Sequence, residues 1–196
     1  MKKGSNTVVI ETDFGTMEAL LYDETPLHRD NFLKLVNEWF YNDLLFHRVI
    51  SWFMIQWWDP DSRGAAADKR LGTGWPGYQI PAEIWAYHFK GTLAAARIGG
   101  PWNPEKESSG SQYYIVQGNL MTDAELDALE AQKWIVYTAA EREQYKTLGG
   151  TPMLDEEYTV FGEVTVWLDV IDQIAATQTA PGDRPLEDVK MKMSVK

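Results

Sequence analysis

The sequence predicts a mainly β protein of one domain, and three observations lead to this fold class. The apolar segments between residues 43 and 96 are short, and glycine, proline and aspartate interrupt them at close intervals. This pattern is typical of antiparallel strands joined by loops. Helical spacing is confined to a few stretches. A chain of 196 residues is long enough to bury one core, so residues 1–196 require no second domain.

The N-terminal elements follow from the positions of the apolar residues. Residues 7–12 and 17–22 predict the two strands of a hairpin, with a turn at residues 13–16. A helix is predicted after Thr25 and Pro26, because threonine favours the N-cap and proline the first helical position. The side chains expected on its buried face recur at helical spacing: Leu27, Phe32, Leu35, Val36 and Trp39.

Further strands are predicted at residues 111–117, 158–164 and 189–195. A second helix is predicted just before the last of these strands. Its expected buried face is formed by Leu168, Ile171, Ile174 and Ala175.

Residues 119–150 differ in character and predict an inserted pair of helices. Thr122 with Glu125, and Thr138 with Glu141, match the capping box, in which each side chain satisfies a free backbone N–H. The glycines at positions 149 and 150 provide a helix stop. We interpret this insertion as a lid or packing appendage without chemistry of its own.

Charge and composition exclude several classes of function. The formal charge of −11 has no compensating basic block, so neither a nucleic-acid nor a membrane partner is expected. The chain has no cysteine, which excludes disulfides, thiol catalysis and cysteine zinc sites. The histidines are His28, His47 and His88, and their separation does not match a metal motif. We expect a cytoplasmic protein, or a periplasmic one if a signal peptide was removed.

The stretch FHRVISWFMIQ carries the most specific chemical pattern. Successive strand side chains face opposite sides, so Arg48 and Ile50 share one face of a strand. By the same rule, Phe53 lies on the face opposite to Met54 and Gln56. An arginine beside aromatic groups would form a shallow apolar pocket with one always charged donor at its edge. An arginine stacked over hydrophobic surface side chains is the alternative that spacing leaves open.

FHRVI, FMIQ and the pair Asp59-Pro60 resemble the signature of the cyclophilin family of peptidyl-prolyl cis-trans isomerases. Other matching segments follow in the expected order: VVIETDFGTMEALLYDETP, NFLKLV, LAAAR, SSGSQYYI, YTVFGEV and DRPLEDVKM. The resemblance covers nearly the whole chain outside residues 119–150. It implies a closed eight-stranded antiparallel β-barrel capped by two α-helices, with the helical hairpin inserted and the proline site on the outer surface.

The resemblance also implies roles for individual residues. Arg48 matches the catalytic arginine, and Gln56 matches the amide that orients the substrate. The remaining matches line the pocket, pair with the peptide backbone or surround the proline ring: Phe53, Met54, Ala96, Arg97, Gln112, Tyr114, Leu154 and Tyr158. Tyr158 stands where some members have histidine.

The implied function is catalysis of rotation about X–Pro bonds in protein or peptide substrates, which assists folding. No cofactor or metal is implied. The implied partners are proline-containing peptides or unfolded proteins, with cyclosporin-like ligands as further candidates, and the chain is expected to be a monomer.

The chain departs from the family pattern at six tryptophans that stand where glycine is usual: Trp39, Trp52, Trp57, Trp58, Trp75 and Trp167. Glycine serves where φ is positive or backbones approach closely, and a left-handed conformation costs other residues about 1–2 kcal/mol. Tolerance of the side chain, deliberate change and an error in the sequence are all open explanations. Trp57 and Trp58 would either extend an aromatic platform for proline-rich peptides, or cover the barrel end or pack on the neighbouring loop.

Two alternatives to the isomerase remain open. One is a proline-peptide binding module of the same fold, with weak or no catalysis because the tryptophans disturb the groove. The other is a barrel that carries a small apolar molecule in its interior.

Overall fold

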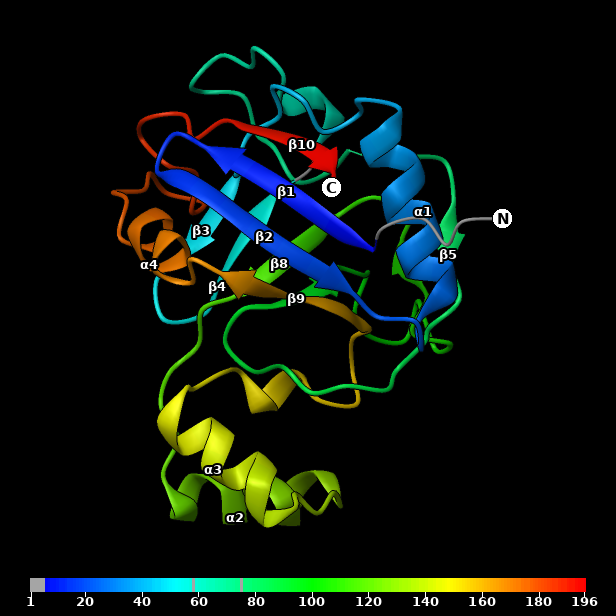
Figure 1. Ribbon diagram of the computed structural model, residues 1–196, viewed down its shortest axis with the longest axis vertical. Coiled ribbons are helices and arrows are strands. Elements are labelled where there is room, and N and C mark those ends of the chain that lie inside the picture. Colours follow the sequence, from blue (N-terminus) through cyan, green and yellow to red (C-terminus); the bar gives the residue numbers. More distant parts are fainter. Residues whose placement is uncertain (1–5, 58, 75) are drawn as a thin grey trace.

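The computed structural model describes residues 6–57, 59–74 and 76–196. Eight strands form one curled antiparallel sheet in the order β10-β1-β2-β9-β6-β8-β4-β3 (Figure 1). Their bounds are β1 Thr7–Thr12, β2 Gly15–Leu21, β3 Arg48–Ile50, β4 Met54–Trp57, β6 Thr92–Ala95, β8 Tyr113–Val116, β9 Val160–Val166 and β10 Met191–Val195. A second, two-stranded sheet pairs β5 (Gln79–Ile80) with β7 (Ser108–Ser109). The prediction of a mainly β fold is confirmed.

Closure of the barrel is shown only in part. No ladder between the edge strands β10 and β3 is present in the described portion of the chain. Instead, the residues that precede each strand approach one another, with a single antiparallel bridge between Leu45 and Lys190. The Phe46 N–H donates to the Val189 carbonyl at 3.0 Å beside this bridge. The sheet therefore curls into a barrel-like form whose last seam consists of irregular backbone contacts.

Two helices lie at opposite ends of the sheet, as expected (Figure 1). Helix α1 (Pro26–Asn37) packs on β9 and β10, and helix α4 (Asp169–Ala175) packs on β2, β3 and β4. Of the predicted buried face of α4, Ile171, Ile174 and Ala175 are buried, whereas Leu168 precedes the helix and is only partly buried. Of the buried face predicted for α1, Phe32, Leu35 and Val36 are buried, whereas Leu27 and Trp39 are exposed, contrary to expectation. Trp39 lies beyond the helix end, so helical spacing does not apply to it.

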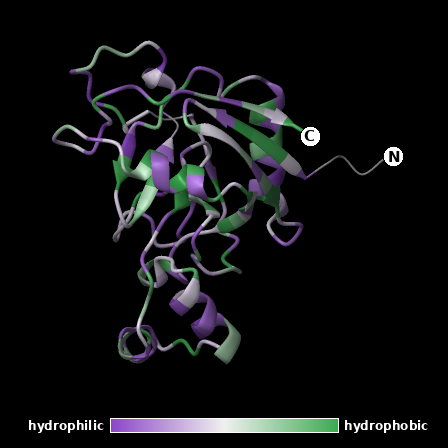
Figure 2. Cartoon of the chain, turned by 60° about the vertical axis from the view of Figure 1, so that its left-hand side comes forward, coloured by the Kyte–Doolittle hydropathy of each residue, from purple (hydrophilic) through white to green (hydrophobic). Residues whose placement is uncertain are grey.

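The inserted hairpin consists of α2 (Asp123–Lys133) and α3 (Ala139–Thr147), between β8 and β9. Both predicted capping boxes are present. The hairpin projects from the body of the molecule in Figures 1 and 2, and its helices carry purple, hydrophilic segments in Figure 2. Two short 3-10 helices, η1 (Pro60–Ser62) and η2 (Pro152–Leu154), complete the elements. None of the helices in the described ranges is long and apolar enough to cross a membrane.

Three of the six tryptophans adopt the left-handed backbone conformation that favours glycine. The φ angle is 59° at Trp39, 65° at Trp52 and 59° at Trp167, and all three side chains are exposed. Trp57 differs, because it lies in β4 and its ring is fully buried against Tyr113. Trp57 is therefore a core residue and does not extend a peptide-binding platform.

Trp58 and Trp75 lie outside the described residues. Trp134, which was not among the six, follows α2 with a φ of 59° and is the most exposed large hydrophobic side chain described. The left-handed conformation thus recurs at tryptophans on separate loops and helix ends.

Candidate active site

The strand register places Arg48 and Gln56 side by side. Arg48 on β3 pairs with Gln56 on β4, and Gln56 pairs with Tyr114 on β8. Residues directly opposite one another in a sheet project to the same face. Val49 and Ile55 pair on the other face and belong to the main core. Strand alternation therefore places one cation, one amide and one aromatic ring together on the outer face.

Strand alternation does not hold for Phe53. Residues 51–53 form the turn between β3 and β4, in which the Phe53 N–H donates to the Ile50 carbonyl at 3.1 Å. Phe53 consequently packs against the outer cluster that contains Met54. Its predicted placement opposite Met54 is wrong, because that prediction assumed that the strand begins before residue 53.

An open groove of about 1180 Å³ runs along this outer face. It brings together all ten residues that the sequence resemblance assigned to the site, although their roles remain predictions. The ten are Arg48, Phe53, Met54, Gln56, Ala96, Arg97, Gln112, Tyr114, Leu154 and Tyr158.

The Arg48 guanidinium is held by two long contacts. Its Nε lies 3.4 Å from Asp183 Oδ2, and its Nη1 lies 3.4 Å from Gln56 Oε1. Both distances exceed those of typical N–H···O hydrogen bonds. The side chain is 43% exposed, and a guanidinium has five N–H donors. Arg48 therefore keeps donors for a ligand in the groove.

Two glutamines connect Arg48 to a neighbouring loop. Gln56 Nε2 donates to Gln112 Oε1 at 3.3 Å, and Gln112 Nε2 donates to the Gly74 carbonyl at 2.9 Å. Asp59 fixes this loop, because its buried carboxylate accepts the Gly74 N–H at 3.2 Å. The amide of Gln56 thus has its oxygen turned to Arg48 and its nitrogen turned to Gln112.

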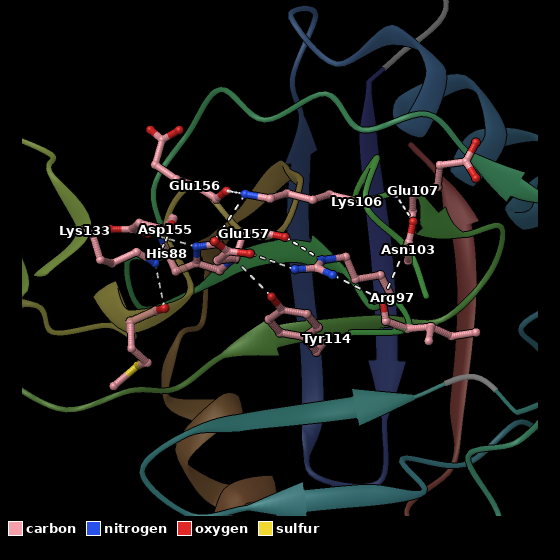
Figure 3. A network of polar contacts seen from close by, with 12 residues as sticks. His88, Arg97, Asn103, Lys106, Glu107, Tyr114, Lys133, Asp155, Glu156 and Glu157 are labelled. Atoms are coloured by element: carbon pink, nitrogen blue, oxygen red, sulfur yellow. Dashed lines mark hydrogen bonds and ion pairs between the residues drawn. The ribbon is translucent and has the colours of Figure 1, made fainter. Parts of the chain in front are cut away.

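The apolar end of the groove is built around Tyr114. The nearly buried Tyr114 ring meets the Tyr158 ring edge-on, with 6.1 Å between centroids. The Arg97 guanidinium lies 4.7 Å from the Tyr158 ring centroid, and its charge is paired with Glu157 at 2.8 Å (Figure 3). Leu154 packs against the same cluster. This end of the groove therefore offers ring faces and aliphatic surface to a ligand.

The backbones of Ala96 and Arg97 differ in whether their hydrogen-bonding groups are free to pair with a bound peptide. The Ala96 N–H donates to the Gln112 carbonyl and its carbonyl accepts the Ser109 N–H, both at 2.8 Å. For the Arg97 backbone, no hydrogen-bond partner is found among the described residues. Backbone pairing with a bound peptide is thus expected at Arg97, while Ala96 contributes its methyl group to the groove.

The family model described as Cyclophilin type peptidyl-prolyl cis-trans isomerase/CLD matches residues 7–195. The chain belongs to the cyclophilin family. A protein from Streptococcus pyogenes serotype M6, named as a bifunctional phosphatase/peptidyl-prolyl cis-trans isomerase, is 35% identical over 185 residues. That match covers 93% of this chain and 37% of the streptococcal protein, so the chain spans little more than a third of its length. A protein from Staphylococcus saprophyticus, named as a peptidyl-prolyl cis-trans isomerase, is 33% identical over 186 residues. That match covers 93% of this chain and 87% of the staphylococcal protein.

Solved structures agree on the fold. A Cryptosporidium parvum cyclophilin-type isomerase superimposes with a TM-score of 0.69 at 20% identity, covering 97% of both chains. The structure of that protein in the presence of the dipeptide Ala-Pro gives a TM-score of 0.68 at 20% identity, covering 97% of this chain and 98% of the other.

Sequence reasoning missed two residues that shape this cyclophilin site. Asp183 is 135 residues from Arg48 in the sequence, yet its carboxylate contacts the guanidinium. The DRPLEDVKM segment matches the family pattern, but nothing in its local sequence indicates which residue it contacts. Asp59 likewise appeared only as part of a signature, although its burial and its hydrogen bonds fix the loop at Gly74. Among the described residues, His, Asp and Glu side chains do not gather into a metal-binding group.

Proposed function

We propose that this chain catalyses cis–trans rotation about X–Pro peptide bonds in protein or peptide substrates. The observation that carries the proposal is the position of Arg48, a permanently charged donor in a groove on the outer face of the sheet that Phe53, Met54 and Tyr114 also line. Membership of the cyclophilin family supports it.

The chemical task is to weaken amide resonance. Resonance gives the peptide bond a rotational barrier of about 18–20 kcal/mol, so X–Pro isomerisation takes roughly tens to hundreds of seconds without help. The bond loses its double-bond character as it twists, and the proline nitrogen becomes pyramidal and gains a lone pair. A donor aimed at that nitrogen or at the proline carbonyl stabilises the twisted state more than either planar state. Arg48 has the unused N–H donors for this role.

The rest of the groove would hold the substrate during the rotation. Phe53, Met54 and Tyr114 provide an apolar surface for the proline ring, and Gln56 orients the guanidinium. The Arg97 backbone would pair with the substrate chain. Neither a covalent intermediate nor an electron transfer is required, because only a torsion changes.

The proposed partners are flexible or unfolded proteins with accessible X–Pro bonds. Cyclosporin-like ligands are proposed as competitors for the same groove. We also propose that the chain acts as a monomer in the cytoplasm.

The test combines exchange and binding measurements on one short Ala-Pro peptide. Two-dimensional NMR exchange spectroscopy gives the cis–trans rate, and titration followed by tryptophan fluorescence gives the affinity. We expect faster exchange at catalytic protein concentrations. Binding without faster exchange would support the binding module instead. The absence of both binding and faster exchange would reject both proposals.

A further inference from the structure

A buried carboxylate lies directly behind the proline pocket. Asp155 follows η2, and its side chain is fully inaccessible to solvent. It accepts four hydrogen bonds, of which two come from the N–H and the ring Nδ1 of His88 at 2.8 and 2.9 Å (Figure 3). His88 is itself fully buried. Its pKa is lowered by this burial, so the ring is neutral at physiological pH.

The other two hydrogen bonds to Asp155 come from the inserted hairpin. Tyr137, in the loop between α2 and α3, donates its hydroxyl to Oδ2 at 2.7 Å, and Tyr145 on α3 donates to the same oxygen at 2.6 Å. Both tyrosines are buried in a small core that packs on residues flanking His88. The Tyr145 ring lies 4.4 Å from the Phe89 ring, centroid to centroid. The hairpin is therefore docked onto the segment that carries His88.

The hydrogen bonds run in one direction from the pocket to the carboxylate. Because His88 Nδ1 donates to Asp155, Nε2 of the neutral ring is left as an acceptor. The Tyr114 hydroxyl lies 3.1 Å from Nε2 and donates to it. Burial raises the pKa of Tyr114 well above its usual value, so the phenol keeps its proton. The two rings are nearly parallel, with 10° between their planes.

A second contact joins the hairpin to the other wall of the pocket. Lys133, in the last turn of α2, donates to the carbonyls of Met153 and Asp155. These carbonyls flank Leu154, which lines the groove. Lys133 thus holds the backbone turn that presents Leu154.

We propose that the α2–α3 hairpin is a brace for the proline pocket, in which Asp155 and His88 are positioning residues that fix Tyr114. This inference rests on the proposed function, because it assigns the hairpin a role in the geometry of that same site. Pre-organisation of this kind matters because small displacements of groups around a reacting bond reduce the rate strongly. The sequence alone predicts a lid or packing appendage without chemistry of its own. Under this proposal the hairpin acts on the reaction through Tyr114 and Leu154.

A double-mutant cycle tests the connection between hairpin and pocket. Tyr145→Phe removes one of the hairpin's two donors to Asp155, and Tyr114→Phe removes the pocket's link to His88; both changes preserve the ring. Contacting or networked residues show non-additive effects, and independent residues show additive ones. We expect Tyr145→Phe to lower kcat/KM about fivefold in the wild-type background and less than twofold in the Tyr114→Phe background. Equal factors in the two backgrounds would overturn the proposal.

Two matched controls separate positioning from general loosening. Tyr113→Phe removes a hydroxyl from the neighbouring residue of β8, whose partners are Asn31 and Gly110 and not the pocket. Lys146→Met removes ion pairs within the hairpin to Asp123 and Glu143, neither of which contacts Tyr137, Tyr145 or Asp155. Both controls should keep kcat/KM within about twofold of wild type, since neither belongs to the network. A fivefold loss in Lys146→Met would show that any destabilisation of the hairpin lowers activity, and this would overturn the proposal.

The state of His88 gives a readout that does not depend on activity. In wild type, 15N NMR should show His88 with a protonated Nδ1 and an unprotonated Nε2. Tyr145→Phe should shift both ring nitrogen signals while the urea unfolding transition remains cooperative; unchanged signals would contradict the brace. If Tyr145→Phe does not fold, Lys133→Met replaces it, with the same expected loss of kcat/KM. If wild type does not accelerate exchange, the proposed function is rejected, while the His88 signals still report on the network.

Discussion

At the scale of single residues, four of the tryptophans that the structure describes hold a backbone conformation that suits glycine. Trp134 is the clearest case, because its φ is 59° and its side chain is 93% exposed. The ring gains almost nothing from packing, whereas the left-handed conformation costs about 1–2 kcal/mol for a residue with a Cβ. Glycine at such a position would also provide a common helix C-terminal cap.

Trp134→Gly should therefore raise the free energy of unfolding by about 0.5–1 kcal/mol, after subtracting the greater entropy that glycine gives the unfolded chain. The measurement is urea denaturation followed by circular dichroism. Trp102→Gly is the matched control, because Trp102 is 86% exposed but does not have a positive φ. Trp102→Gly should slightly lower the free energy of unfolding. A gain in stability as large as that of Trp134→Gly would contradict the backbone explanation.

His47 gives a prediction for acid stability. Both its ring nitrogens are buried, without a hydrogen-bond partner among the described residues, and burial lowers its pKa to about 4. Between pH 6.5 and 4 the unfolded chain binds a proton that the folded chain does not, so stability falls as the pH falls through this window. The pKa difference corresponds to about 3 kcal/mol, and His28 and His88 contribute with the same sign.

Urea unfolding at pH 7 and pH 4.5, together with NMR titration of the three histidine rings, measures this effect. His47→Gln should reduce the dependence of stability on pH. A His47 ring that titrates near 6.5 in the folded protein would refute the prediction.

At the scale of elements, the α2–α3 hairpin joins the sheet where Asn119 pairs with Gly150. Asn119 and Gly150 exchange backbone hydrogen bonds of 3.1 and 2.9 Å. Gly118 beside them has a φ of 64°, and a Cβ there would lie 2.3 Å from the carbonyl carbon of Gly150. The two backbones approach so closely that no side chain fits between them.

Gly118→Ala should lower the free energy of unfolding by about 3 kcal/mol, from the left-handed conformation and the backbone clash together. Gly64→Ala is the control, because Gly64 has a φ of 63° but its Cβ would meet no atom within 4 Å. Its loss should be about 1 kcal/mol. Thermal and urea denaturation measure both losses. If the two variants lose the same free energy of unfolding, the close approach of the two backbones is unimportant.

The elements that the sequence predicted well are those set by local chemistry. The capping boxes at Thr122 and Thr138 form as expected because each uses residues three positions apart. The hydrogen bonds of Tyr137 and Tyr145 to Asp155 were not predicted, because no short-range pattern indicates which buried acceptor a distant hydroxyl reaches. The turn that redirects Phe53 was missed for a related reason, since its apolar sequence also suits a strand.

At the scale of the whole molecule, the mainly β fold and the residues of the groove could be predicted because the motif order matches one family. Strand alternation then explains why Arg48 and Gln56 lie together on the outer face. The seam of the sheet could not be predicted, because it depends on contacts between residues 43–46 and 189–191, far apart in the chain. The contact between Arg48 and Asp183 joins equally distant segments.

Under the proposed function, Arg48 acts on the proline amide. The most direct measurement is NMR exchange of an Ala-Pro peptide with wild type, Arg48→Ala and a control, Arg29→Ala. The control removes a guanidinium on α1 that is paired with Asp23 and Asp30. Loss of one donor that stabilises a transition state lowers the rate by about 100-fold or more. We predict that loss in kcat/KM for Arg48→Ala, with wild-type exchange in Arg29→Ala. Exchange at the wild-type rate in Arg48→Ala would contradict the claim.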